Sequence, residues 1–415
     1  MTPDQSQTPT LESRPTPAER NGTDANPTMP VRRKISKTRI VRSDDWYPLM
    51  VFLVSRAGFM LLSYLSLGTH RISSGLRGFR HNLFLDGFVR WDSSWYGGLV
   101  DHGYIAPTAI AKGVQRNTAL FPLYPLVVRW VKLAVGNTWI AGLLVSNLAF
   151  LAATIMLHQL VLRRFGEACA RRAVVLLCVA PFSVFFMAVY SESLFLALAI
   201  GAFFAAERRH WLAAGILAAL AGATRVNGFL IVPGLALLYL EQIEFKLGSL
   251  RWDALLVAVG LVGPLAHLTF LWLRYGSPFE FWHAQYVLGW ASEAPVSGAL
   301  SELADAIRPS MLAAGRGASL TFVQLLSPAF LLLIVSWGVW KRKIAWSYAM
   351  WSVLTTASAF TKWTSAGRYV SVVFPLYILM AVLGERPTLY HVLLALSCVL
   401  AAHQQILFAL GRWVA

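Results

Sequence analysis

The sequence predicts an all-α protein that crosses a membrane many times. Of its 415 residues, 57% are hydrophobic and only 13% are charged, and the mean hydropathy is +0.56. A soluble chain usually has about a quarter charged residues. Apolar runs of nearly 20 residues recur along the chain, which is about the length that an α-helix needs to cross the hydrocarbon core of a bilayer.

The net charge of +16 fits lysine and arginine residues that orient membrane helices. Nucleic-acid binding is not predicted, because the basic residues are scattered and no soluble domain gathers them on one face. Cys169, Cys178 and Cys398 are far apart in the chain, so neither a disulfide framework nor a metal site is indicated. No cofactor is expected.

Residues 1–45 are predicted to form a disordered, basic cytoplasmic tail, and residues 46–415 a single multi-span domain. Residues 1–30 are rich in Pro, Thr, Ser and Asn and have no apolar core, unlike a signal peptide. Residues 31–42 carry six basic side chains. Each of these would gain roughly 1 kcal/mol beside anionic membrane lipids.

About eleven transmembrane helices are expected. They lie near 47–67, 139–161, 173–189, 192–206, 211–223, 228–240, 253–273, 319–340, 345–361, 369–383 and 388–409. The stretch 119–135 contains two prolines and two basic residues, so it is interpreted as a re-entrant or interfacial helix. Residues 173–206 and 211–240 could each form one helix instead, but such helices would run ~45–50 Å, which is long for a ~30 Å core.

The basic residues indicate a cytoplasmic N-terminus. With this orientation every short inner loop is basic, as the positive-inside rule expects. The residues concerned are Arg163, Arg164, Arg171, Arg172, Arg208, Arg209, Lys246, Arg251, Lys341, Arg342, Lys343 and Arg386. Long outer loops are expected at about 68–138 and 274–318.

Polar residues then gather at the extracytoplasmic face. Five polar islands fall there, at 90–104, 190–193, 224–228, 275–290 and 362–369. Ionisable side chains are costly at a membrane, so their convergence on one face predicts a functional site.

The first island, RWDSSWYGGLVDHGY, contains Asp92 between aromatic residues. Asp92 suits either a helix N-cap or a general base that takes a proton from a sugar hydroxyl. Trp91, Trp95 and Tyr96 suit either a sugar-binding wall or an interfacial aromatic belt. Asp101 and His102, later in the island, could support this site, but a solvated loop is the preferred interpretation.

Arg225 and Arg368 each suit either a snorkelling arginine or a residue that binds a lipid phosphate. Lys362 lies near Arg368 in the sequence and is a further candidate for binding the phosphate. Glu192 suits either a carboxylate at the start of a helix or a residue of the functional site. Further candidate contacts to substrate are Tyr104, Asn227, His283, Gln285 and Tyr369.

Several of these stretches together resemble the PIG-V-type mannosyltransferases, which act in glycosylphosphatidylinositol (GPI) anchor assembly, and especially their bacterial relatives. The similar stretches are RWDSSWYGGLVDHGY, NTALFPLYPLVVR, AVYSESLFL, GATRVNGFL, YGSPFEFWHAQ and SAGRYVSVVFPLYI, in the order of the family and across most of residues 85–380. The sequence departs from the family where Ser277 follows the glycine of YGSPF, since an acidic residue is expected there.

The resemblance implies a GT-C fold with an extracytoplasmic active site. It implies an inverting transfer of mannose from a polyprenyl- or dolichyl-phosphate donor to a lipid-linked or glycan acceptor, with the essential aspartate at Asp92. A bacterial plasma membrane is preferred as the location over the endoplasmic reticulum. A transporter or flippase of lipid-linked sugar is the alternative, although a carrier should hold its polar site near the membrane midplane.

Overall fold

The computed structural model describes residues 46–70, 72, 78–79, 82–107, 116–285, 318–359, 365–412 and 414. The chain divides into one unit at Met1–Ser43 and another at Asp44–Ala415. The predicted tail 1–45 and most of the loop 274–318 lie outside the described residues, so both stay predictions.

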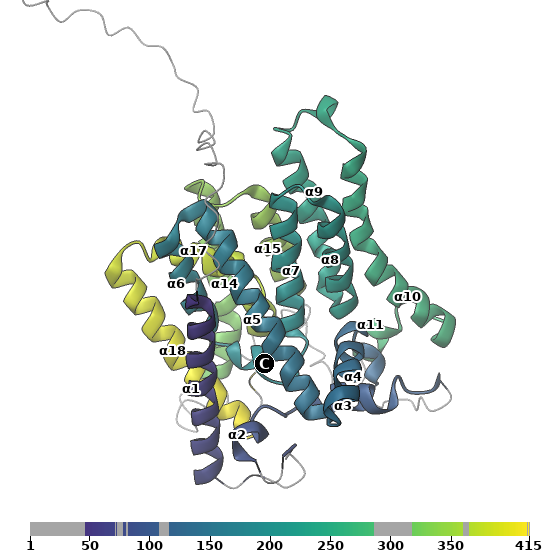
Figure 1. Cartoon of the computed structure of the whole chain (residues 1–415), viewed down its shortest axis with the longest axis vertical. Coiled ribbons are helices and arrows are strands. Elements are labelled where there is room, and N and C mark those ends of the chain that lie inside the picture. Colours follow the sequence, from purple (N-terminus) through teal and green to yellow (C-terminus); the bar gives the residue numbers. More distant parts are fainter. Residues whose placement is uncertain are drawn as a thin grey trace, which may run out of the picture. The chain divides into compact units, whose positions relative to one another are not determined.

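Every secondary-structure element in the described ranges is a helix (Figure 1). The α-helices are α1 (Tyr47–Thr69), α2 (Leu83–Asp86), α3 (Asp92–His102), α4 (Leu123–Val135), α5 (Thr138–Phe165), α6 (Glu167–Cys178), α7 (Glu192–Glu207), α8 (Trp211–Thr224), α9 (Ile231–Gln242), α10 (Val262–Tyr275), α11 (Glu280–Gln285), α14 (Ala318–Trp340), α15 (Trp346–Ala359), α16 (Ala366–Ser371), α17 (Pro375–Leu383) and α18 (Pro387–Ala409). The 3₁₀ helices are η3 (Asn117–Ala119), η4 (Ser183–Phe186), η5 (Val226–Leu230), η6 (Leu247–Ser249) and η7 (Trp252–Leu261).

Four helical segments are long and apolar enough to cross a membrane: Tyr47–Thr69, Thr138–Phe165, Trp252–Tyr275 and Pro387–Ala409. The shortest have 23 residues, or about 35 Å at 1.5 Å per residue, which exceeds the hydrocarbon core. Shorter apolar helices occur at Trp211–Thr224, Val226–Gln242 and Leu326–Trp340. The protein is therefore an all-helical, multi-pass membrane protein, while the count of eleven spans and their orientation stay predictions.

One predicted helix is not continuous in the structure, and another is divided into two helices. Residues 173–189 do not form a continuous helix: α6 ends at Cys178, the short η4 follows, and α7 begins only at Glu192. Pro181 lacks the N–H that a continuing helix would need. Arg56 of α1 donates from Nη2 to the Cys178 carbonyl at 3.3 Å and so caps the end of α6. The expected helix 369–383 likewise divides, into α16 and α17, with Pro375 as the first residue of α17.

The break expected between 223 and 228 is confirmed. Helix α8 ends at Thr224, Arg225 is extended (φ −151°, ψ 149°), and η5 leads into α9. These breaks matter because they interrupt helices beside the polar residues of the chain.

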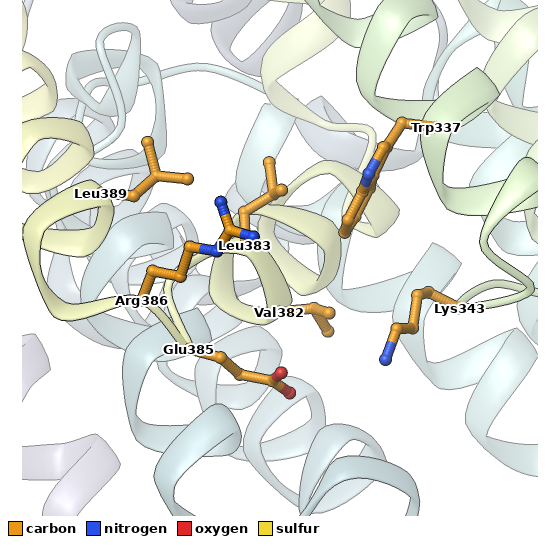
Figure 2. A pocket seen from close by; sticks show the side chains of 7 residues that line it. All are labelled: Trp337, Lys343, Val382, Leu383, Glu385, Arg386 and Leu389. Atoms are coloured by element: carbon orange, nitrogen blue, oxygen red, sulfur yellow. The ribbon is translucent and has the colours of Figure 1, made fainter.

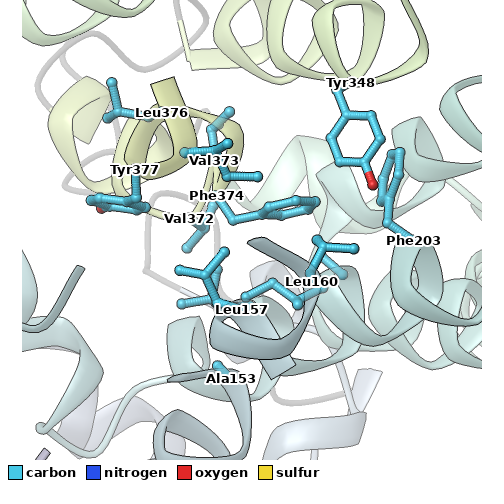
Figure 3. Packing of buried hydrophobic residues seen from close by; sticks show 14 of the residues in the cluster. Ala153, Leu157, Leu160, Phe203, Tyr348, Val372, Val373, Phe374, Leu376 and Tyr377 are labelled. Carbon is cyan, nitrogen blue, oxygen red and sulfur yellow. The ribbon is translucent and has the colours of Figure 1, made fainter. Parts of the chain in front are cut away.

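Helix α7 lies within the main core and is buried on nearly all sides. Phe203 of α7 packs in this core with Leu157 and Leu160 of α5 and with Phe374, just before α17 (Figure 3). Small residues let neighbouring helices approach closely. A Cβ on Gly263 of α10, for example, would lie 1.8 Å from the Ala219 carbonyl oxygen of α8.

A cavity of about 250 Å³ lies beside the C-terminal end of α17 (Figure 2). Its lining comprises Trp337, Lys343, Val382, Leu383, Glu385, Arg386 and Leu389. This lining includes none of Asp92, Glu192, Arg225 and Arg368.

Candidate active site

Four charged side chains from four distant parts of the sequence meet in the structure. Arg368 of α16 contacts Asp92, the first residue of α3, at 2.6 Å between Nη1 and Oδ2. Its Nε also contacts Oε1 of Glu192, the first residue of α7. Arg225, after α8, donates from Nη1 to the same Glu192 oxygen at 2.5 Å. Asp92, Glu192, Arg225 and Arg368 are called the four-charge cluster below.

The four-charge cluster is buried, and its exposure increases toward Asp92. The Glu192 side chain is 0% exposed, those of Arg368 and Arg225 are 8% and 9% exposed, and that of Asp92 is 14% exposed. Two carboxylates balance two guanidinium groups, which offsets part of the desolvation cost of burying charge. Asp92 is therefore the member most accessible to a substrate hydroxyl.

The charged residues of the cluster lie where helices begin or end. Glu192 begins α7, where the helix dipole stabilises a negative charge. Ser191 accepts a hydrogen bond from Arg225 Nη1 at 3.2 Å and lies 2.8 Å from the Tyr96 hydroxyl, which links α3 to the start of α7.

Aromatic rings support both guanidinium groups. Arg368 Cζ lies 4.7 Å from the centre of the Tyr190 ring and 5.2 Å from that of Phe185. Arg225 Cζ lies 5.2 Å from the centre of the Tyr369 ring. Cation–π contacts of this kind help to retain a positive charge away from water.

Asp92 follows a tight turn with an unusual backbone. Trp91 has φ 52° and ψ −116°, and the Ser93 N–H donates to the Arg90 carbonyl at 3.0 Å. This is the geometry of a type II′ turn, whose first central position strongly favours glycine. A tryptophan there costs of order 1–3 kcal/mol, and such strain is common at functional sites.

Arg90, the residue before Trp91, fixes the position of this turn. Its Nη2 pairs with Asp86 Oδ2 at 2.7 Å, both side chains being fully buried, and its Nε donates to the Ala409 carbonyl of α18 at 3.1 Å. The start of α3 is thereby tied to α2 and to the end of α18.

The four-charge cluster retains unused polar atoms. Among the described residues, Asp92 Oδ1, Arg368 Nη2 and the Nε and Nη2 atoms of Arg225 have no hydrogen-bond partner. Glu192 Oε2 and both amide atoms of Asn227 are buried without a partner in this part of the chain. These atoms could bind a phosphate and sugar hydroxyls.

The chain matches a family model described as "Mannosyltransferase (PIG-V)" over residues 61–265. Across these residues, just under half of the chain, it is similar to the PIG-V mannosyltransferases. The matched region includes Asp92, Glu192 and Arg225 and ends before Arg368, which the structure adds to them.

A curated relative is GPI alpha-1,6-mannosyltransferase 2 of Mus musculus, with 32% identity over 160 residues. The alignment covers 35% of this chain and 30% of the mouse protein, so the chain matches less than a third of that relative. The relatives from Cricetulus griseus and Rattus norvegicus bear the same name and match over similar lengths.

Solved structures support a GT-C-like fold for this chain. The oligosaccharyltransferase of Archaeoglobus fulgidus has a TM-score of 0.50 and 13% identity, covering 90% of this chain and 57% of that one. ArnT of Cupriavidus metallidurans, bound to undecaprenyl phosphate, has a TM-score of 0.50 and 16% identity, covering 87% of this chain and 64% of that one. At this identity the likeness concerns the fold alone.

The other predicted site residues lie either beside the four-charge cluster or apart from it. Trp91 and Trp95 flank Asp92 in the turn and in α3. The Tyr104 hydroxyl instead donates to the Leu120 carbonyl at 2.8 Å, and Gln285 donates to the Ala119 carbonyl at 3.4 Å. His283 is exposed on α11, and Lys362 lies outside the described residues. The substrate roles of all these residues stay predictions.

Helix α11 and η3 share a separate acidic contact. Glu280, three residues after Ser277, pairs with Arg116 at 2.9 Å and accepts a hydrogen bond from Thr118 at 3.3 Å. An acidic residue is therefore present near the departure from the family motif, and it joins α11 to η3.

Asp101 in α3 pairs with Lys132 at 2.7 Å and accepts a hydrogen bond from Thr138 at 2.6 Å. Partial burial alone would raise the pKa of Asp101, but these hydrogen bonds outweigh it and hold that pKa below its ordinary value. Asp101 thus has a defined partner, in contrast to the solvated loop expected from the sequence.

Sequence reasoning missed Tyr190, Ser191 and the Asp86–Arg90 pair. The island 190–193 was recognised, but only Glu192 was selected from it. A carboxylate and an arginine four residues apart in the apolar run LFLDGFVR were the available signal for the buried pair.

Proposed function

We propose that the protein is a membrane glycosyltransferase that moves mannose from a polyprenyl- or dolichyl-phosphate donor to a hydroxyl of a lipid-linked or glycan acceptor. The reaction would occur at the extracytoplasmic face with inversion. The observation that carries the proposal is the four-charge cluster, because it joins a candidate base to two candidate phosphate ligands within a family of mannosyltransferases.

Asp92 is assigned as the general base. Its Oδ1 accepts the proton of the acceptor hydroxyl while that oxygen attacks C1 of mannose from the face opposite the phosphate. The bond between C1 and the phosphate oxygen breaks, and the lipid phosphate leaves with the bonding electrons. Mannose then has the opposite anomeric configuration. No metal is required in this scheme.

Arg225 and Arg368 are assigned to the donor phosphate. Their unused N–H groups can donate to phosphate oxygens while Glu192 keeps both guanidinium groups in place. The charge of a leaving phosphate grows in the transition state, so fixed guanidinium groups would stabilise that state more than the ground state. The undecaprenyl phosphate in the ArnT structure supports a donor of this lipid class.

The Asp92–Arg368 contact has a consequence for the donor complex. Arg368 pairs with the proposed base in the structure. A phosphate that draws Arg368 toward itself would weaken this pair and leave Asp92 more available as a proton acceptor. Donor binding and activation of the base are therefore expected to be coupled.

The test is transfer of labelled mannose from polyprenyl-phosphate mannose by protein purified in lipid, with a membrane extract as source of acceptor. Wild type is compared with Asp92→Asn and with Asp101→Asn, a matched change on the same helix outside the four-charge cluster. Transfer by wild type and by Asp101→Asn, but not by Asp92→Asn, is expected. Equal transfer by all three proteins would overturn the assignment of the base.

The location belongs to the same proposal. A bacterial plasma membrane, with the four-charge cluster facing outward, fits the basic inner loops. Cysteine labelling from outside intact cells at a Ser94→Cys variant, an exposed position of α3, tests this orientation. Labelling only after the membrane is opened would contradict it.

A further inference from the structure

The conformation of the turn before Asp92 requires a restraint. Trp91 occupies a position with positive φ that disfavours residues with a Cβ, and Asp92 is the next residue. Any relaxation of Trp91 toward an ordinary conformation would rotate the peptide before Asp92 and redirect its carboxylate.

The Tyr190 side chain forms hydrogen bonds with the backbone on both sides of Trp91. The Asp92 N–H donates to the Tyr190 hydroxyl oxygen at 3.1 Å, and the Tyr190 hydroxyl donates to the Arg90 carbonyl at 3.2 Å. These two backbone groups flank Trp91 on either side. A phenol that both accepts and donates can hold them together, whereas phenylalanine can do neither.

Tyr190 is itself held rigidly. It is 1% exposed, and its ring centre lies 5.0 Å from that of Phe185 and 5.8 Å from that of Phe408. Its carbonyl accepts a hydrogen bond from Ser146 of α5 at 3.1 Å. The hydroxyl therefore has a fixed position against which the turn can be held.

We propose that Tyr190 is a positioning residue that locks the strained Trp91 turn and thereby aims the Asp92 carboxylate at the acceptor hydroxyl. This inference rests on the proposed role of Asp92. The Tyr190 ring also lies under Arg368, so the same side chain sets both partners of the Asp92–Arg368 contact.

A double-mutant cycle with Trp91 tests the lock. Tyr190→Phe should lower kcat by about tenfold to a hundredfold and leave the KM for donor within about twofold, since misaimed reacting groups reduce rate rather than binding. In a Trp91→Gly background the turn is unstrained, so adding Tyr190→Phe should cost about twofold or less. Equal fold losses in the two backgrounds would overturn the proposal.

Tyr239 provides a matched control. Its hydroxyl also accepts from a backbone N–H, that of Arg251 at 3.2 Å, and donates to Asp253 at 2.6 Å, but it touches no member of the four-charge cluster. Tyr239→Phe should leave kcat unchanged. A loss of kcat equal to that of Tyr190→Phe would show that removing a buried hydroxyl is harmful in general.

Hydrogen–deuterium exchange of the purified protein gives a second readout that needs no enzymatic activity. Tyr190→Phe should speed exchange in peptides covering residues 90–96 by about tenfold, and Tyr239→Phe should do so only around Arg251. Faster exchange at 90–96 without transfer by any protein would uphold the lock and reject the proposed function. Unchanged exchange at 90–96 in Tyr190→Phe would reject the lock itself.

Discussion

Replacing Glu192 by glutamine should destabilise the protein more than any comparable change on the same helix. Glu192 is fully buried and its carboxylate contacts both Arg225 and Arg368. The neutral amide keeps the shape but changes the formal charge of the four-charge cluster from zero to +1. Removing one partner of a buried ion pair typically costs about 3–5 kcal/mol, because the remaining charge is desolvated without compensation.

The matched control is Glu207→Gln at the other end of α7. Glu207 accepts a hydrogen bond from Tyr348 and lies 3.7 Å from Arg164, but its side chain is 34% exposed. Partly exposed ion pairs contribute about 0–1 kcal/mol. The two variants therefore differ by several kcal/mol in expected loss, although both remove one charge from one helix.

The assay is equilibrium unfolding in mild detergent, with thermal unfolding as a second measure. A double variant, Glu192→Gln with Arg225→Leu, should recover part of the lost stability, since it removes the one excess positive charge and leaves Arg368 paired with Asp92. If Glu192→Gln loses no more unfolding free energy than Glu207→Gln, the four-charge cluster is not the buried network that the contacts indicate.

Three further predictions follow from individual contacts. Arg225→Ala should weaken binding of polyprenyl-phosphate mannose by at least tenfold in a direct binding assay, and unchanged affinity would remove its phosphate role. Gly263→Leu should lower the free energy of unfolding by about 1–3 kcal/mol, because the new side chain collides with the Ala219 carbonyl. Gly58→Leu should cost little, because a Cβ there meets nothing within 4 Å. Equal losses would argue against the close approach of α10 to α8. The lowered pKa of Asp101 means that its ionised form stabilises the fold above the pKa of the unfolded chain, and that this contribution disappears as pH falls through the folded-state pKa. Wild type should thus lose more stability on acidification than Asp101→Asn, and parallel curves would contradict this.

Hydrophobicity and charge were sufficient to predict the fold class. Long apolar runs require helices in a membrane, and the breaks near Arg225 and before Glu192 follow from placing an ionisable residue between two apolar segments. The end of α6 at Cys178 was missed, because the residues around Pro181 are as apolar as a continuous helix would be.

The charges of the candidate site were predictable singly, but their pairing was not. Asp92, Glu192, Arg225 and Arg368 each stand out as ionisable residues in an apolar chain. Sequence cannot show that Arg368 contacts both carboxylates, since those contacts span 276 and 176 residues. The role of Tyr190 was equally hidden, because it depends on the backbone conformation of Trp91 rather than on any residue pattern.

The most direct test of the central claim is the single-turnover rate of mannose transfer by Asp92→Asn at saturating donor, measured beside its donor affinity. A general base contributes about 10²- to 10⁴-fold to rate, so a loss in that range with donor affinity retained is predicted. A rate within about tenfold of wild type at equal donor affinity would show that Asp92 is not the base.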